Sequence, residues 1–165
     1  MAGAVEKQHE ALLRRSLEAV IVAALHPRAL IQVVVQVVAE DGGVLACALN
    51  AACAALVDAG VPLRTLCAAV AAAQAPEGGG LLLDPTAAEE AAAAATGTFA
   101  YLPLLAASGG SDGARGGGDL QLLASVTSGR LTTDQLLDMV EAARQGADRM
   151  AAFMQLAARQ GAAQT

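Results

Sequence analysis

The spacing of apolar and polar residues divides the chain into helical and extended segments. Over residues 6–26, apolar residues recur every three or four positions with charged residues opposite them, which predicts an amphipathic helix that ends at Pro27. The stretch ALIQVVVQVVAE at 29–40 has strand length and is rich in valine, a residue that favours the pleated sheet. We predict a strand there, with Gln32 and Gln36 on one face and the odd-numbered isoleucine and valines on the other.

The middle of the chain is rich in alanine. Residues 44–59 predict a helix that ends before a glycine and a proline, and its small side chains indicate a central position with close neighbours on several sides. Residues 63–75 and 81–85 predict paired strands joined by a glycine turn at 78–80. In the stretch that follows, TAAEEAAAAATGTFAYLPLL, composition alone favours a helix.

The last third of the chain adds a linker, a strand and a long helix. Residues 107–118, ASGGSDGARGGG, predict a flexible linker, because glycine and serine dominate and no periodicity is present. Residues 120–129 predict a strand, and Thr132 and Gln135 fit a capping box that opens a helix with one apolar stripe. The element order predicts a single α+β domain over residues 1–165, with helices on one face of a mainly antiparallel sheet.

Composition and charge narrow the possible partners. Of the residues 55% are apolar, yet only two are Phe, one is Tyr and none is Trp, so small side chains must fill the core. The net charge of −6 argues against strong nucleic-acid binding by charge alone, although a few arginines could line a shared channel. The three cysteines lie in apolar stretches without a CxxC motif, which favours buried reduced thiols over a metal site. We expect an intracellular protein with no signal peptide, membrane span, metal or cofactor.

One turn carries candidate chemistry. Asp41-Gly42-Gly43 leads directly into the alanine-rich helix, and a turn of that kind often presents backbone N–H groups to an anion at a helix N-terminus. The turn is therefore either the edge of a phosphate-using site or the scaffold of a site that has lost its chemistry.

The segment HPRALIQVVVQVVAEDGGVLACALNAACAALVDAGVPLRTL resembles the RNase PH family, and within it the ring subunits of the eukaryotic exosome. The run VLACALNAACAALVDAGVP is the most specific part, and LLLDPT at 81–86 keeps the family order. The resemblance covers residues from about 6 to 158 and is dense from 25 to 90. It implies a split β-α-β fold in which part of residues 90–104 is extended. Family members begin with several more antiparallel strands, which this sequence is expected to lack.

The resemblance also implies a chemistry that this chain does not retain in full. The family's phosphorolytic enzymes hold phosphate at a GGTR turn, which here reads Gly42-Gly43-Val44-Leu45. A hydroxyl and a guanidinium are thus replaced by two aliphatic side chains. Because the phosphate nucleophile and the phosphodiester that it attacks are both anions, the turn lacks the cationic donor that would neutralise them. Of the family's two carboxylates, six residues apart, Asp84 is kept and Glu90 stands in the second position. We therefore expect no phosphorolysis.

Two functions remain open. In the first, the chain is a non-catalytic subunit of the exosome ring that supports 3′-to-5′ RNA processing and degradation. Its partners would be other RNase PH-like subunits, a cap subunit and RNA passing through the ring, in the nucleus and nucleolus and also the cytoplasm. The RNA-binding candidates are Arg64, Arg28 and Arg15. In the second, Asp84 and Glu90 hold Mg²⁺ in a nuclease that acts as a homodimer outside the ring. A purely structural role for the two carboxylates is also open: Asp84 would cap a turn and Glu90 would be solvated.

Overall fold

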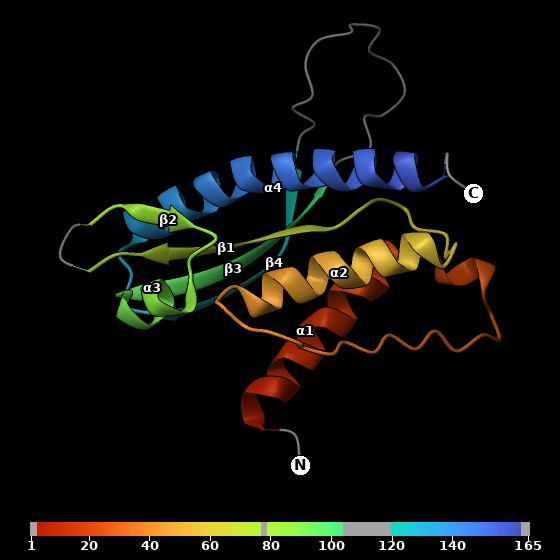
Figure 1. The fold of residues 1–165 in the computed structure, drawn as a ribbon, viewed down its shortest axis with the longest axis horizontal. Helices are drawn as coiled ribbons and strands as arrows, with labels where there is room; N and C mark the ends of the chain where they lie inside the picture. Colours follow the sequence, from red (N-terminus) through yellow and green to blue (C-terminus); the bar gives the residue numbers. More distant parts are fainter. Residues whose placement is uncertain (1–2, 77–78, 104–119, 163–165) are drawn as a thin grey trace, which may run out of the picture.

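The computed structural model describes residues 3–76, 79–103 and 120–162, arranged as one sheet between helices (Figure 1). The helical elements are α1 (Ala4–Val20), the 3-10 turn η1 (Ala23–Leu25), α2 (Val44–Asp58), α3 (Ala87–Ala92) and α4 (Thr133–Ala162). The strands are β1 (Ala68–Gln74), β2 (Leu81–Leu83), β3 (Ala95–Pro103) and β4 (Leu120–Gly129). The mixed α+β class and the antiparallel sheet are as the sequence predicts. None of the described helices is both long enough and apolar enough to cross a membrane.

The sheet has the order β2-β1-β3-β4, and every neighbouring pair is antiparallel. β1 pairs along its whole length with β3, from Ala68 opposite Tyr101 to Gln74 opposite Ala95. On its other edge β2 pairs with only the last three residues of β1. β1 is therefore one of the two inner strands, with β3, and all seven of its residues are buried.

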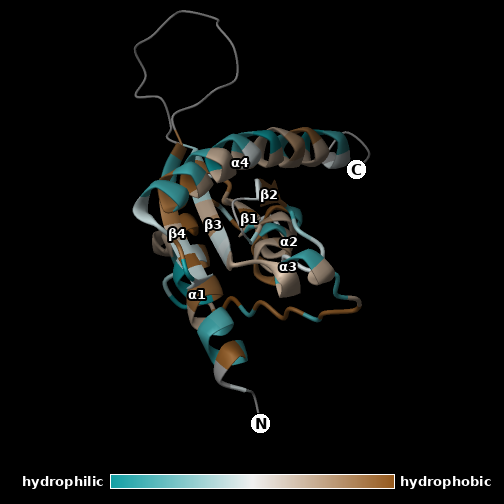
Figure 2. Ribbon diagram, turned by 90° about the vertical axis from the view of Figure 1, so that its left-hand side faces the viewer, coloured by the Kyte–Doolittle hydropathy of each residue, from teal (hydrophilic) through white to brown (hydrophobic). Residues whose placement is uncertain are grey.

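Helices cover both faces of the sheet, which corrects the prediction that they lie on one face. In β1 successive side chains point to opposite sides: Ala69 and Ala71 pack in a cluster with α1 and α2, whereas Ala68, Val70 and Ala72 pack in a second cluster with α4. Figure 1 shows α4 on one side of the sheet and α1 with α2 on the other, and Figure 2 shows the same layers from the side. Alanines lie on both faces of β1, so both faces are equally apolar. The sequence therefore contains no polar face that would indicate on which side the helices lie.

The α4 side of the core is closed around the few aromatic residues. Phe99 and Tyr101 of β3 are buried against Met139, Ala143 and Ala147 of α4. The Tyr101 hydroxyl donates a hydrogen bond of 2.6 Å to the carbonyl oxygen of Val140, and burial raises the pKa of this phenol to about 12. The apolar stripe predicted for the last helix is thus core packing.

The predicted strand at 29–40 is wrong in one respect: the segment is extended but pairs with no described strand. An isolated antiparallel bridge forms outside this segment, between Ile21, just after α1, and Leu63, before β1. Several aliphatic side chains of residues 29–40 are largely exposed, and Figure 2 shows this segment as a mostly brown trace that runs below α2. Valine has a high strand propensity, but no strand among the described residues pairs with this segment.

Other boundaries differ by a few residues from those predicted. The first helix ends at Val20, before Pro27, and η1 follows it after two non-helical residues. The alanine-rich stretch after β2 forms α3 and then β3. Its first residues follow the helix propensity of alanine, whereas pairing within the sheet overrides that propensity in the rest. The linker at 107–118 and part of the predicted turn at 78–80 lie outside the described residues.

Candidate functional site

The degenerate phosphate turn lies at the start of α2. Gly42 and Gly43 have φ angles of +90° and +60°, a region that favours glycine, and Gly43 is the N-cap residue of the helix. A side chain at Gly42 would collide with the carbonyl oxygen of Pro85 and the backbone of Thr86 and Ala87. The turn is therefore clamped against the segment between β2 and α3.

Two carboxylates hold this clamp in a reciprocal way. The N–H of Gly43 donates a hydrogen bond of 2.9 Å to Oε1 of Glu90, on α3. In return, the N–H of Ala87 at the start of α3 donates one of 3.2 Å to Oδ1 of Asp41. Each carboxylate thus satisfies a donor that the other helix leaves unpaired. The anion at the N-terminus of α2 is accordingly a side chain of the chain itself.

Asp84 and Glu90 border the same glycine, as the family spacing suggests. A Cβ added at Gly43 would lie 3.4 Å from Oδ1 of Asp84, and the N–H of Gly43 binds Glu90. Asp84 is exposed and has a φ of +53°, and its N–H donates to the carbonyl of Ala71. Among the described residues, no group of three or more His, Cys, Asp or Glu side chains could hold a metal ion. Glu90 is hydrogen-bonded rather than simply solvated, so its structural role is a specific one.

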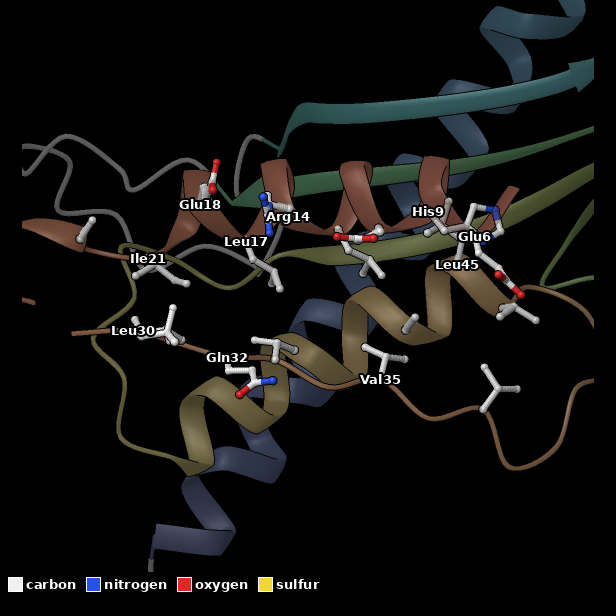
Figure 3. A pocket seen from close by; sticks show the side chains of 18 of the residues that line it. Glu6, His9, Arg14, Leu17, Glu18, Ile21, Leu30, Gln32, Val35 and Leu45 are labelled. Atoms are coloured by element: carbon white, nitrogen blue, oxygen red, sulfur yellow. The ribbon is translucent and has the colours of Figure 1, made fainter. Parts of the chain in front are cut away.

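Val44 and Leu45 make the next positions apolar. Both line a groove of about 910 Å³ between α1, the start of α2 and the extended segment, with Leu45 buried and Val44 partly buried (Figure 3). α1 contributes the polar rim: three carboxylates, from Glu6, Glu10 and Glu18, and one guanidinium, from Arg14. A rim with more carboxylates than cations is unfavourable for a phosphate.

The three arginines predicted to contact RNA are all exposed and do not gather at the turn. Arg15 lies on α1, and Arg28 follows η1. Arg64 lies beside the end of α1, because its N–H donates to the carbonyl of Val20. It also follows the C-terminal end of α2, and a helix of 15 residues places that end about 22 Å from the glycine turn. No contact among the described residues therefore joins Arg64 to Asp84 or Glu90.

Sequence reasoning missed Asn50, the polar residue in the middle of α2. Its Nδ2 donates to the carbonyl of Ala69 and its Oδ1 accepts from the N–H of the same residue, both at 2.8 Å. Because β2 is too short to reach Ala69, this amide completes the hydrogen bonding of β1 at that edge. The only signal in the sequence is one amide side chain in a run of small apolar residues.

The chain is similar to known proteins in sequence. The family model for the 3′ exoribonuclease family, domain 1, matches residues 2–62. The exosome complex exonuclease RRP46 homolog of Arabidopsis thaliana is 45% identical over 76 residues, which are 46% of this chain and 32% of the relative. The exosome complex component RRP41 of Mus musculus is 37% identical over 148 residues, which are 90% of this chain and 54% of the relative.

The fold is similar as well. The crystal structure of Rrp46 from rice (Oryza sativa) matches with a TM-score of 0.80 and 30% identity, over 96% of this chain and 68% of that chain. The chain belongs to the RNase PH family. The resemblance carried by the glycine turn and the alanine-rich helix is thus confirmed, and the sequence relatives of this RNase PH chain are exosome subunits. The matches cover about a third of the plant relative and about half of the mouse one.

Proposed function

We propose that this chain is a non-catalytic subunit of an RNA exosome ring. It supports 3′-to-5′ processing and degradation of ribosomal and messenger RNA by scaffolding the ring and by guiding RNA. Its partners are other RNase PH-like subunits, a cap subunit and the RNA, in the nucleus, the nucleolus and the cytoplasm. Arg64, Arg28 and Arg15 are the proposed RNA contacts, since all three are exposed cations outside the glycine turn.

The occupied N-terminus of α2 is the observation that carries this proposal. A phosphate nucleophile needs free backbone donors and a cation at this turn. Here the N–H of Gly43 already binds Glu90, and the two following side chains are aliphatic. An incoming phosphate would have to displace a carboxylate and would meet aliphatic side chains in place of the family's guanidinium.

Catalysis is tested on the purified chain with a labelled single-stranded RNA. We expect no shortening of the RNA with inorganic phosphate, with Mg²⁺ or with both, and no release of nucleoside diphosphates. Phosphate-dependent shortening would contradict the proposal. Leu45→Arg with Val44→Thr serves as the matched variant, because it restores the guanidinium and hydroxyl of the family turn while leaving Glu90 in place.

Membership of a ring is tested separately. The tagged chain, purified from cells, is expected to bring down the other ring subunits together with a cap subunit, as identified by mass spectrometry. Recovery of the chain alone would contradict the scaffold role even if no RNA is cleaved. Reversal of charge in Arg64→Glu is expected to leave assembly intact and to weaken RNA crosslinking to this subunit.

A metal-dependent nuclease is the second candidate, because Asp84 and Glu90 both border Gly43. It requires Mg²⁺ to compete with the Gly43 N–H for the Glu90 carboxylate. Mg²⁺-dependent cleavage that Asp84→Asn abolishes, and that Glu89→Gln leaves unchanged, would replace the first proposal with this one. Glu89 is the control because it lies on the same short helix and its carboxylate is engaged with Thr86.

A further inference from the structure

We propose that Cys53 and Cys67 are a redox-sensitive pair, which oxidation joins in a disulfide that fastens α2 to the start of β1. This inference goes beyond the proposed function, because it concerns a covalent change inside the core and involves neither the ring nor RNA. It rests on the burial of the two side chains, on the contact between them and on the hydrogen bonds that hold α2 against β1.

The two cysteines meet in the core between α2 and the sheet. Both are fully buried, and both belong to the cluster that α1 and α2 form with one face of β1. The backbone N–H of Cys67 donates a hydrogen bond of 3.3 Å to Sγ of Cys53. Because neither side chain has an exposed surface, this contact does not depend on what else covers the molecule.

The hydrogen bond limits how far apart the two residues can be. In Cys67 the donor nitrogen is about 1.5 Å from Cα, and in Cys53 the sulfur is about 2.8 Å from Cα. Together with the 3.3 Å between nitrogen and sulfur, these lengths limit the separation of the two Cα atoms to at most about 7.6 Å. Disulfides span Cα separations of about 4.4–6.8 Å, so the pair can be bridged with at most a small shift of the backbone.

Asn50 fixes α2 against β1 beside the pair. Its side chain binds both the N–H and the carbonyl oxygen of Ala69, at 2.8 Å each. Asn50 lies about one turn before Cys53 on α2, and Ala69 lies two residues after Cys67 on the same side of the strand. The amide contact and the cysteine contact are therefore neighbours, and the first keeps the residues of the second close together in the reduced chain.

The third cysteine of the chain lies apart from the pair. Cys47 is exposed, and it precedes Cys53 by six residues, which is about 9 Å along the helix and on a different face. Burial raises the pKa of both Cys53 and Cys67, so both are held as thiols in the reduced protein. Soluble reagents should therefore modify Cys47 first, and the pair should react more slowly but with itself.

Hydrogen peroxide, a two-electron oxidant, can complete the reaction with the two thiols alone. The thiolate of one cysteine attacks a peroxide oxygen, the O–O bond breaks, and a sulfenic acid and one water form. The thiolate of the other cysteine attacks that sulfur, the S–S bond forms, the S–O bond breaks, and hydroxide leaves to become a second water. The chain thus loses two electrons and two protons, and the peroxide gains them.

Peptide mapping tests the pairing. The Cys47→Ala chain is treated with hydrogen peroxide, alkylated and cut with trypsin, which places Cys53 in residues 29–64 and Cys67 in residues 65–115. We expect these two peptides to be joined in a monomeric chain that has lost two hydrogen atoms, and to be separated by a thiol reductant. Cys47→Ala/Cys67→Ala is the matched control and should give no joined peptides. Absence of the joined peptides after prolonged oxidation, or their presence only in covalent dimers, would overturn the proposal.

Thermal unfolding tests whether the disulfide fastens the helix to the strand. Oxidised Cys47→Ala is expected to unfold about 5–10 °C above its reduced form, because a disulfide between residues 14 positions apart restricts the unfolded chain. Peroxide treatment should shift the Tm of Cys47→Ala/Cys67→Ala by less than about 2 °C. A joined pair that unfolds at the same temperature as the reduced chain, or at a lower one, would contradict the fastening.

Both measurements concern the core of the purified chain alone. Neither of them bears on ring assembly or RNA cleavage, so failure here is distinguishable from failure of the proposed function. Circular dichroism shows whether each variant keeps its fold. Mapping of the Cys47→Ala chain, which keeps both buried cysteines, decides the pairing even where the control variant does not fold.

Discussion

β1 and the segment at 29–40 each lie in the environment that the composition of the other would suggest. β1 reads AAVAAAQ, a composition with weak strand propensity, and all of it is buried as an inner strand of the sheet. The segment reads ALIQVVVQVVAE, with strong strand propensity, yet it pairs with no described strand and is largely exposed. The difference teaches that the partners available to a stretch of chain decide its state, more than the stretch's own preference does.

The partners of β1 come from every direction. β3 pairs along one edge, β2 and the amide of Asn50 complete the other, and helices cover both faces. Alanine is well suited to this place, since its small side chain lets α2 and α4 approach the strand closely. Among the described residues, the segment lines the groove beside α1 and α2, and most of its side chains are exposed.

The largest contrast between the two regions is expected in hydrogen exchange. At low protein concentration, the amides of residues 30–39 should exchange at close to the rate of an unstructured peptide, because they have no acceptor among the described residues. The amides of β1 should exchange only on global unfolding, slower by a factor on the order of a thousand or more. Mass spectrometry of peptides from both regions measures this difference. Comparable protection of both regions at low concentration would contradict the contrast.

Among the single substitutions considered, Asn50→Ala is expected to cause the largest loss in the free energy of unfolding. It removes both partners of the backbone of Ala69, which is 1% exposed, and two unsatisfied buried groups destabilise by about 2–4 kcal/mol. Gln36→Ala, in the exposed segment, is the control and should change the free energy of unfolding by less than about 0.5 kcal/mol. Urea unfolding measures both. Asn50→Asp, which keeps the acceptor and loses the donor, should fall between them.

Periodicity and turn chemistry predicted most of the elements and their order. The helix at 44–59, the strand at 120–129 and the capping box at Thr132 follow from local rules, and the structure has α2, β4 and α4 at these places. The unpaired state of residues 29–40 could not be predicted, because pairing depends on residues far away in the chain. The placement of helices on both faces could not be predicted either, since alanine on each side of β1 gives no polar face.

The glycine turn was predictable in outline and not in its contacts. The motif placed Gly42, Gly43, Asp84 and Glu90 in one region, and the structure brings them together. Glu90 itself occupies the anion position at the N-terminus of α2, and Asp41 accepts a hydrogen bond at the start of α3. Both contacts depend on how the two helices meet. The amide of Asn50 is a further case, because its partner is a backbone position 19 residues later.

Enlarging one side chain in each region is expected to give a smaller difference in the free energy of unfolding than the substitution of Asn50 does. Ala72→Leu places three extra carbons in a position of β1 that is 1% exposed and packed against the α4 cluster, so overpacking is expected to cost about 1–3 kcal/mol. Val38→Leu adds one methylene to a side chain that is 93% exposed, and should change the free energy of unfolding by less than about 0.5 kcal/mol. Thermal and urea unfolding measure both variants. A loss from Val38→Leu as large as that from Ala72→Leu would show that the segment is packed as tightly as the strand.

The smallest effect is expected from mildly alkaline pH, acting through the thiol that precedes β1. Burial, followed by the charge of nearby Cys53, raises the pKa of Cys67 to about 12. The folded chain therefore holds this proton where the unfolded chain has lost it, so stability is full below the unfolded pKa and falls as pH rises above it. Between about pH 7.5 and 9.5 we expect a loss of about 1 kcal/mol in the free energy of unfolding. Cys67→Ala should reduce this slope and Cys47→Ala, at an exposed position of α2, should leave it unchanged. Because burial also raises the pKa of Cys53, part of the slope should persist in Cys67→Ala, whereas equal slopes in all three proteins would refute the assignment.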